Sequence, residues 1–427
     1  MKTKEDIFNI IEEEDIEFIR LQFTDIKGNL KNIAVTPGQL DRAISHSCRF
    51  SGSAIFDNCA DFPEELCLHP ILDSFVVLPW RPQQGKVARL VCEVCTEDGK
   101  PFPLCPRKIL GSVLEKAAES GYSFWVDPEC EFFLFHTDEF GLPTTITHER
   151  AGYMDVGPTD FGENARRDIV LMLEEMGFDV ESSLHEASPA QHEIRFKEQE
   201  AMQLADSLQT FRFAVRSVAK QFGLYATFMP KPRADCAGSG MHLSFALVKD
   251  GKNLFRSSDG SPSETALSFI GGLLTHAPAL TAIGDQTVNS YKRLLSDSDA
   301  PDRVNWSSKG EKSFVKLVHN SDDTKVELRF PDGSANPYLI IAAAIAAGID
   351  GIEKRMNPGE DCRDASECPH VPLTLKDAVL GLEADEVITD ALGKEFTSVY
   401  AGIKKSEWRD YMTSVSDWEL DRYLSRL

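Results

Sequence analysis

The stretch Asp127-Pro128-Glu129-Cys130-Glu131-Phe132-Phe133-Leu134-Phe135 places two glutamates within a run of apolar residues. Side chains alternate between the two faces of a strand, so Glu129 and Glu131 point the same way. Two ionised carboxylates on one face of an apolar strand repel each other and resist burial unless a cation lies between them. An edge strand with a solvated face is the alternative, but the flanking aromatic residues disfavour it. The stretch therefore predicts a buried strand that helps to hold a cation.

A second pair of glutamates lies in the segment Ser183-Leu184-His185-Glu186-Ala187-Ser188-Pro189-Ala190-Gln191-His192-Glu193-Ile194. We expect the chain to fold back at Ser188-Pro189-Ala190. A tight return would bring Glu186 and Glu193 together on neighbouring strands. Surface hairpins often carry two glutamates, so this segment alone is a weak indication of a site.

Two later segments carry further polar residues on strand-like patterns. In Gly238-Ser239-Gly240-Met241-His242-Leu243-Ser244, His242 and Ser244 share one face. A single histidine there is more often a satisfied core residue than a ligand, although the glycines allow backbone to approach a ligand closely. Residues 324–330 alternate strictly and place Lys325, Glu327 and Arg329 on one face. From that segment alone we expect a solvent-exposed face of alternating charge.

Composition narrows the possible partners. The net charge of −23 argues against nucleic acid and against an anionic membrane surface as partners. No apolar run approaches the ~20 residues that span a bilayer, and the acidic start is no signal peptide. We therefore expect a cytoplasmic protein, and we expect its ten scattered cysteines to be reduced thiols.

The order of the expected elements indicates an α+β protein with more than one domain. A helix over 4–14 and strands over 16–23, 30–35, 75–78 and 87–94 would form a small mixed sheet, with a hairpin at Lys27-Gly28-Asn29. The polar, Pro-rich stretch 96–106 is the expected boundary. Beyond it we expect a helix that begins at Pro106 and a strand over 130–136. Further helices are expected over 162–176, 204–222, 263–283 and 338–352.

Several motifs, in order and over nearly the whole length, resemble class I glutamine synthetases. They are Asp155-Val156-Gly157-Pro158-Thr159-Asp160, Gly162-Glu163-Asn164, Arg166-Arg167-Asp168, Ala226-Thr227-Phe228-Met229-Pro230-Lys231-Pro232, Gly238-Ser239-Gly240-Met241-His242, Asn289-Ser290-Tyr291-Lys292-Arg293-Leu294 and Ala335-Asn336-Pro337-Tyr338-Leu339. The resemblance implies a β-grasp domain over 1–100, then a catalytic domain over 101–427 with a curved antiparallel sheet and surrounding helices. It also implies a dodecamer of two six-membered rings, with each active site between neighbouring subunits.

The resemblance also implies the site residues. One metal ion would be held by Glu131, Glu186 and Glu193, and the other by Glu129, His242 and Glu327. Oxygen-rich ligands suit Mg²⁺ or Mn²⁺. Such a site uses ATP to phosphorylate a carboxylate, which an amine then attacks. The remaining family positions are Gly238 and Arg293 for the acid substrate, Arg329 for substrate and catalysis, and Ser244 for ATP.

The sequence departs from the family pattern on the amine and phosphate sides. Ser51, in Phe50-Ser51-Gly52-Ser53-Ala54, replaces an aspartate that helps to bind and deprotonate ammonium. Asp299 replaces a glutamate of the flap that covers the acyl intermediate. Other replacements are Glu311 or Lys312, Lys316 and Lys325 for phosphate-binding arginines, Ala237 for an asparagine and Ala246 for a serine. Lysine supplies charge without a fork of donors, so we expect weaker transition-state stabilisation.

Three hypotheses follow from this pattern. The first, which we favour, is an ATP-dependent ligase that joins glutamate or a similar acid to an amine other than ammonia. The second is an ordinary glutamine synthetase, in which another acid such as Asp57 replaces the missing aspartate. The third is a catalytically impaired paralogue with a regulatory or assembly role.

The resemblance also bears on regulation. Some members of the family are adenylylated on a tyrosine in the loop after the buried helix, but residues 356–373 contain no tyrosine. A related subgroup uses an arginine for feedback inhibition by glutamine, and Ala60 stands at that position. We therefore expect neither form of regulation.

Overall fold

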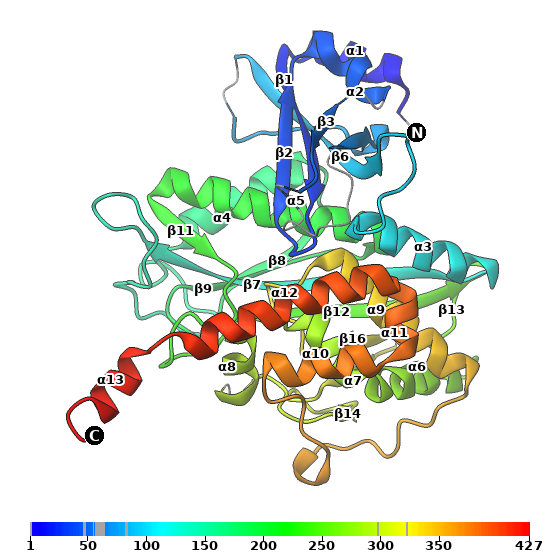
Figure 1. The fold of residues 1–427 in the computed structure, drawn as a ribbon, viewed down its shortest axis with the longest axis vertical. Helices are drawn as coiled ribbons and strands as arrows, with labels where there is room; N and C mark the ends of the chain where they lie inside the picture. The colour runs from blue at the N-terminus through cyan, green and yellow to red at the C-terminus, as the bar shows by residue number, and fades with distance from the viewer. Residues whose placement is uncertain are drawn as a thin grey trace.

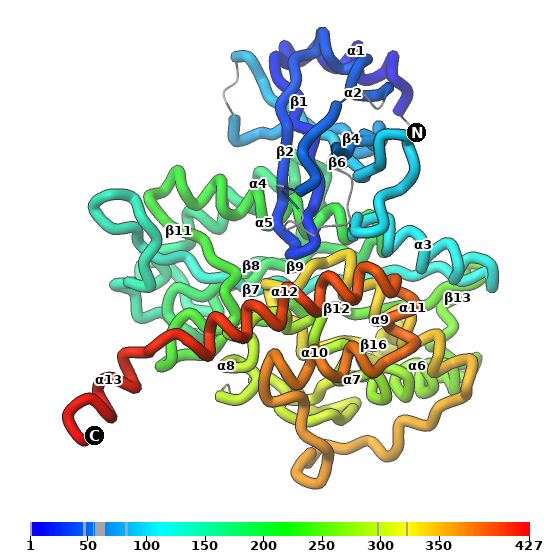
Figure 2. The backbone as a smooth tube through the Cα atoms, viewed as in Figure 1, coloured from blue at the N-terminus to red at the C-terminus, as the bar shows by residue number. Residues whose placement is uncertain are grey.

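The computed structural model describes residues 2–45, 48–53, 55, 65–81, 84–296, 299–321 and 323–427. Asp57, Ala60 and Ala54 lie outside the described residues, as do Asp297 and Ser298 beside Asp299. The chain forms a small N-terminal sheet domain above a larger α+β body (Figure 1). The two parts follow each other along the chain, as the colours of the tube show (Figure 2).

The N-terminal domain is a mixed sheet of order β2-β1-β6-β4-β3, with β5 beside β6. β1 and β2 are antiparallel and form the expected hairpin, whereas β1 and β6 run parallel. Gly28 in the hairpin turn has φ +86°, a left-handed conformation that glycine adopts without strain. The elements are α1 (Lys4–Glu13), β1 (Ile16–Thr24), β2 (Leu30–Val35), α2 (Leu40–Ile44), β3 (Arg49–Ser51), β4 (Glu65–Pro70), β5 (Val76–Val77) and β6 (Lys86–Thr96).

The larger body is built on a second sheet of order β14-β15-β16-β12-β7-β9-β8. Its strand pairs are antiparallel except β14 with β15. β7 lies near the centre and is its longest strand. It confirms the strand expected over 130–136 and begins seven residues earlier, at Ser123. The strands are β7 (Ser123–His136), β8 (Val180–His185), β9 (Gln191–Phe196), β10 (Gln199–Glu200), β11 (Leu224–Thr227), β12 (Met241–Lys249), β13 (Lys252–Asn253), β14 (Trp306–Ser307), β15 (Val315–His319) and β16 (Thr324–Leu328).

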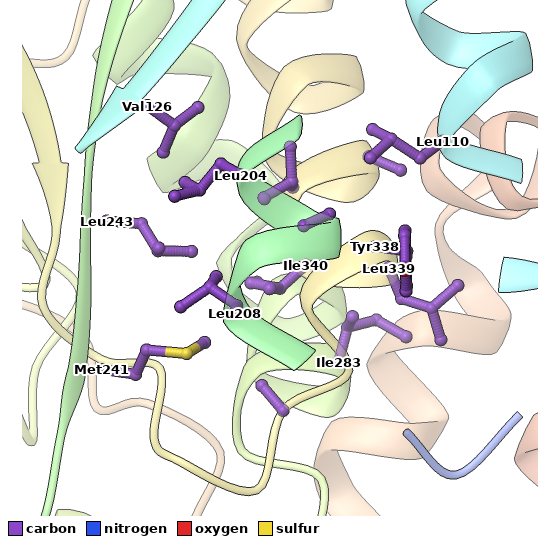
Figure 3. Packing of buried hydrophobic residues seen from close by; sticks show 14 of the residues in the cluster. Leu110, Val126, Leu204, Leu208, Met241, Leu243, Ile283, Tyr338, Leu339 and Ile340 are labelled. Carbon is purple, nitrogen blue, oxygen red and sulfur yellow. The ribbon is translucent and has the colours of Figure 1, made fainter. Parts of the chain in front are cut away.

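One face of this sheet is covered by helices. Val126 of β7 and Met241 and Leu243 of β12 pack toward Leu204 and Leu208 of α5 and toward α9 (Figure 3). The opposite faces of the same strands are therefore left for polar residues. The helices are α3 (Pro106–Glu119), α4 (Glu163–Glu175), α5 (Ala201–Ala219), α6 (Glu264–Thr275), α7 (Ala277–Gly284), α8 (Val288–Ser296), α9 (Pro337–Glu353), α10 (Leu375–Ala384), α11 (Glu386–Leu392), α12 (Lys394–Thr413) and α13 (Asp417–Tyr423).

The single helix expected over 263–283 is wrong. α6 ends at Thr275, α7 begins at Ala277, and the two are bent by 75°. Pro278 in the first turn of α7 cannot continue α6, because it lacks an N–H and its ring clashes with the carbonyl four residues earlier. Within the described residues no single helix is long and apolar enough to cross a membrane, and this bent pair meets that criterion only when joined.

The β1–β2 hairpin fastens the small domain to the large one. Gln209 of α5 donates to the Gly28 carbonyl, and Gln286 donates to the Lys27 carbonyl, at 3.1 and 3.0 Å. Asn336, the N-cap of α9, donates to the Asp25 carbonyl at 3.2 Å. The hairpin tip reaches the helices of the large body in both ribbon and tube views (Figures 1 and 2). The two sheets are therefore held in a fixed relation by buried amide donors.

Candidate active site

The polar face of the large sheet brings the predicted metal ligands together across four strands. Register places His242 of β12 opposite Glu129 of β7, and Glu131 of β7 opposite Glu193 of β9. Glu327 of β16 pairs with Ser244 on the other side of β12. Segments more than a hundred residues apart in sequence thus supply one cluster.

Two overlapping groups in this cluster have the spacing of cation ligands. His242 Nδ1 lies 3.1 Å from Glu129 Oε1 and 3.8 Å from Glu327 Oε1. One ligand atom from each of these three residues lies within 4.8 Å of the others, and the same holds for Glu129, Glu131 and Glu193. Carboxylate oxygens with one imidazole form the donor set that Mg²⁺ and Mn²⁺ prefer.

The β8–β9 turn holds the sixth residue, Glu186, beside this cluster. Ala190 in the turn has φ +68°, and the Glu186 N–H donates to the Gln191 carbonyl at 2.8 Å. Behind the turn, Glu149 accepts hydrogen bonds from His185 Nε2 at 2.8 Å and from the Ala190 N–H. The expected return of the chain at residues 188–190 is confirmed, and buried polar contacts on its far side fix it.

The electrostatics of the cluster favour a bound cation. Burial and the neighbouring Glu186 carboxylate raise the pKa of Glu131 to about 8. Burial and nearby carboxylates likewise raise the pKa values of Glu186 and Glu193 to about 7. Burial, with help from Arg329, lowers the pKa of His242 to about 3, so its ring is neutral and free to donate a lone pair. Burial and mutual repulsion thus disfavour the ionised carboxylates, and divalent ions would offset both.

A cavity of about 390 Å³ opens directly onto the cluster. Arg293 is buried, and its guanidinium donates to the Phe330 carbonyl at 2.7 Å. Arg329 donates to Glu327 at 2.6 Å, which ties this arginine to the ligand group. The cavity is lined by Glu129, Glu131, Tyr153, Glu186, Ala187, Gln191, Ala237, Gly238, His242, Arg293, Asp299, Ala300, Glu311 and Arg329. Metal-type ligands, two arginines and the Gly238 backbone therefore meet in one space.

The same chain matches known proteins along its length. The model of the glutamine synthetase β-grasp domain matches residues 15–97, and that of the glutamine synthetase catalytic domain matches residues 103–423. Glutamine synthetase of Clostridium saccharobutylicum is 45% identical, with 99% of each chain covered. That of Halobacterium salinarum is 43% identical, covering 98% of this chain and 96% of the relative. The chain belongs to the glutamine synthetase family. Its fold is thus the expected β-grasp domain with a glutamine synthetase catalytic domain.

Solved structures agree with this assignment. GmaS in complex with ADP superimposes with a TM-score of 0.90 at 33% identity, covering 98% of this chain and 99% of that one. GmaS without ligand gives a TM-score of 0.89 at 32% identity, covering 99% and 100%. This family member is therefore a ligase, and its family normally uses ATP and divalent metals, acts on small molecules and forms oligomers.

The predicted phosphate-side lysines of this glutamine synthetase family member are engaged by carboxylates. Lys316 donates to Glu311 at 2.6 and 2.7 Å, and Lys325 pairs with Glu198 at 2.6 Å and also with Asp127 and Asp323. The Lys312 ammonium lies 3.5 Å from Asp302. None of the three lysines, nor Ser244, is among the described residues that line the cavity. The structure thus leaves their assignment to ATP as a prediction.

Ser51 lies away from this subunit's own cluster, at the end of β3 in the small domain. It is exposed, its hydroxyl lies 3.1 Å from that of Ser53, and it is absent from the described lining of the cavity. Asp299 and Ala237, in contrast, both line the cavity. The role of Ser51 at an active site between neighbouring subunits therefore stays a prediction from the family resemblance.

At the site, one expectation from sequence was wrong and two residues were missed. The face of β16 is not solvent-exposed, because Glu327 is 6% exposed and Lys325 and Arg329 are enclosed by carboxylates. Gln191 was missed, although it donates to Glu131 and to the Gly238 carbonyl at 3.0 and 2.9 Å. Arg195 was missed too. It contacts Glu193 at 2.6 Å and Glu129 at 2.7 Å. Both share the face of Glu193 on β9, so alternation could have found them.

Proposed function

We propose that this protein is an ATP-dependent ligase that activates the γ-carboxylate of glutamate, or of a similar acid, as an acyl phosphate and transfers it to an amine. The observation that carries the proposal is that Glu129, Glu131, Glu186 and His242 line one cavity together with Arg293 and Arg329. Glu193 and Glu327 join these ligands in two groups with the spacing of cation ligands. Phosphoryl transfer between two anions needs concentrated positive charge and fixed geometry. Arg293 and Arg329 would supply part of that charge, and divalent ions held by the carboxylates would supply the rest.

The proposed metal groups are Glu131, Glu186 and Glu193 for one ion, and Glu129, His242 and Glu327 for the other. Two divalent ions, Mg²⁺ or Mn²⁺, would neutralise the transferring phosphoryl group when bound. The protein's part is to hold the ligands in place. The Gly240 N–H and Gln191 both donate to Glu131 Oε2, at 2.9 and 3.0 Å, which fixes that carboxylate before any ion arrives.

The acid substrate is proposed to lie between Gly238 and the two arginines. Arg293 is oriented by the carbonyls of Phe330 and Arg329, at 2.7 and 3.3 Å, so part of its fork remains directed at the cavity. A guanidinium can pair bidentately with a carboxylate. Asp299 at the rim is proposed to take the part of the family's flap glutamate, with a shorter arm. ATP would approach the lysine side, at Lys312, Lys316, Lys325 and Ser244.

The nucleophile is proposed to be an amine rather than ammonia, because Ser51 offers no charge to attract ammonium and no base to take its proton. In the proposed dodecamer, Ser51 would approach the cavity of the adjacent subunit. A primary amine with an organic tail could recover affinity by burying apolar area, at ~25 cal/mol per Å². The ADP bound to GmaS supports nucleotide use by a protein of this fold.

A panel assay of phosphate release tests this proposal. Purified protein with Mg²⁺ or Mn²⁺ and ATP is given glutamate with either ammonia or one of several primary amines. We expect poor turnover with ammonia, better turnover with some amine, and partial rescue of ammonia use by Ser51→Asp. Ser53→Asp is the matched control, since it adds the same charge two residues away and should rescue less.

Ordinary glutamine synthesis is the second candidate, because the curated relatives at 43% and 45% identity carry that name. Glutamine formation at a normal rate, unchanged by Ser51→Asp, would favour it over the amine ligase. Metal binding without turnover on any acid or amine would contradict both candidates. It would place the defect at Glu311, Lys316 and Lys325, where carboxylates pair with the lysine ammonium groups.

A further inference from the structure

Two thiols meet in the loop that follows the buried helix α9. The sulfurs of Cys362 and Cys368 lie 3.6 Å apart, which is van der Waals contact. Both residues are partly exposed, whereas the described cysteines 67, 92, 95, 105 and 130 are buried. Cys362 Sγ also donates to the Asp364 carbonyl at 3.0 Å, so its side chain has a defined position. Small reagents can therefore reach a preformed pair of thiols.

Both ends of this loop are fastened to the same neighbouring segment, residues 303–308. The Cys362 N–H donates to the Trp306 carbonyl at 3.0 Å, and Asn305 Nδ2 donates to the Cys362 carbonyl at 3.0 Å. The Cys368 carbonyl accepts from Arg303 Nη1 at 2.9 Å. The backbone on both sides is thus held in place. The sulfurs must move from 3.6 Å to the 2.03–2.05 Å of a disulfide, which needs little more than side-chain adjustment.

The segment beneath the loop leads into the active-site cavity. Ser307 donates to Asp361, the residue before Cys362, at 2.7 Å. The same Ser307 oxygen accepts from the Gly310 N–H at 3.0 Å, and Gly310 precedes Glu311, which lines the cavity. A covalent change at the thiol pair therefore acts on a loop that shares hydrogen bonds with the proposed phosphate side.

A metal ion is a poorer explanation for the pair. A structural zinc site needs four ligands, usually cysteine and histidine. Among the residues that the structure describes, no histidine, aspartate or glutamate joins the two sulfurs as a third ligand within 4.8 Å. Two thiols in contact without a third ligand are better suited to oxidation than to metal binding.

We propose that Cys362 and Cys368 form a reversible intrachain disulfide under mild oxidation, and that this disulfide restrains residues 305–313. With hydrogen peroxide as the oxidant, the thiolate of one cysteine attacks an oxygen and becomes a sulfenic acid, releasing hydroxide. The second thiol attacks that sulfur, the S–O bond breaks, and water leaves. In sum, two thiols and one peroxide yield one disulfide and two waters, and a dithiol reductant reverses the change.

Alkylation and peptide mass spectrometry test the first part. Reduced full-length protein is treated with stoichiometric peroxide, alkylated and digested. We expect the peptides that contain Cys362 and Cys368 to lose alkylation together and to carry a mass lower by two hydrogens, with dithiothreitol restoring both. Cys368→Ser should abolish the link, whereas Cys236→Ser, which removes another partly exposed thiol, should leave it intact. Alkylation of both cysteines at a peroxide level that oxidises Cys236 would overturn the proposal.

Amide hydrogen exchange tests the second part, and it does not depend on catalysis. Oxidised wild type should exchange several-fold more slowly than reduced wild type over residues 305–313, and Cys368→Ser should show no such difference. A disulfide that forms without slowing amide exchange over residues 305–313 would refute the proposed restraint. Because neither readout uses substrate turnover, failure here is distinguishable from failure of the proposed ligase activity.

Discussion

Replacing Glu131 by glutamine is the sharpest test of the metal-site electrostatics. Glu131 accepts its two hydrogen bonds, from Gln191 and the Gly240 N–H, on one oxygen. A glutamine carbonyl can accept both, so the change removes charge while keeping shape. We expect opposite effects with and without metal. Metal-free Glu131→Gln should be more stable than wild type at alkaline pH, yet it should lose most of the stabilisation by Mg²⁺ or Mn²⁺.

The sign follows from the raised pKa of Glu131, about 8 in the folded protein against an ordinary 4.5. Below pH 4.5 the group is protonated in both states and contributes nothing. As pH rises toward 8, the unfolded chain loses this proton while the folded chain keeps it, so the free energy of unfolding falls. A pKa difference of one corresponds to ~1.4 kcal/mol. Glu131 is partly exposed and lines the cavity, so we expect about 2–3 kcal/mol, roughly half of the full value.

Urea denaturation of the metal-free proteins at pH 5 and pH 9 measures this difference. The two proteins should be nearly equal at pH 5, with the variant more stable by about 2–3 kcal/mol at pH 9. Glu181→Gln, which alters an exposed glutamate of β8, is the matched control and should show no such gap. Equal stability of wild type and Glu131→Gln at both pH values would refute the reasoning, as would an unchanged response to metal.

Three further predictions use other contacts of the site and the fold. Arg195→Gln should tighten Mn²⁺ binding about threefold to tenfold by calorimetry, since the half-exposed guanidinium competes for Glu193 through a charge-assisted hydrogen bond; weaker binding would contradict this. Glu311→Gln should lower the KM for ATP in steady-state kinetics, because it releases Lys316; a higher KM would show that Glu311 assists. Gly28→Ala should cost about 1–3 kcal/mol in urea denaturation, since a Cβ at φ +86° would lie 3.2 Å from the Asn336 backbone; no loss would mean that the hairpin is loosely docked.

The sequence was sufficient to predict which face of its strand Glu129, Glu131 and His242 occupy. Alternation in residues 127–135 and 241–245 correctly separated Glu129, Glu131 and His242 from the core-facing residues. Period-two patterning is a local property, so it survives without knowledge of the fold. The hairpins at Gly28 and Pro189 were also local, since each depends on a few turn residues.

Burial of the charged face of β16 could not be predicted locally. The segment 324–330 has the pattern of a solvent-exposed strand, and only its neighbours β12 and β15 enclose Glu327. The thiol contact of Cys362 and Cys368 depends likewise on a loop fastened to residues 303–308. The break between α6 and α7, in contrast, could have been predicted from the sequence, because Pro278 indicates the end of a helix. The apolar periodicity of residues 263–283 was given more weight than this proline.

Isotope transfer from the acid substrate to phosphate tests the proposed chemistry most directly. The protein, ATP and metal are incubated with glutamate labelled with ¹⁸O in its γ-carboxylate and with the best amine from the panel. An acyl phosphate intermediate predicts that one ¹⁸O atom appears in the released phosphate for each amide formed. Unlabelled phosphate, or label found in AMP with release of pyrophosphate, would contradict it.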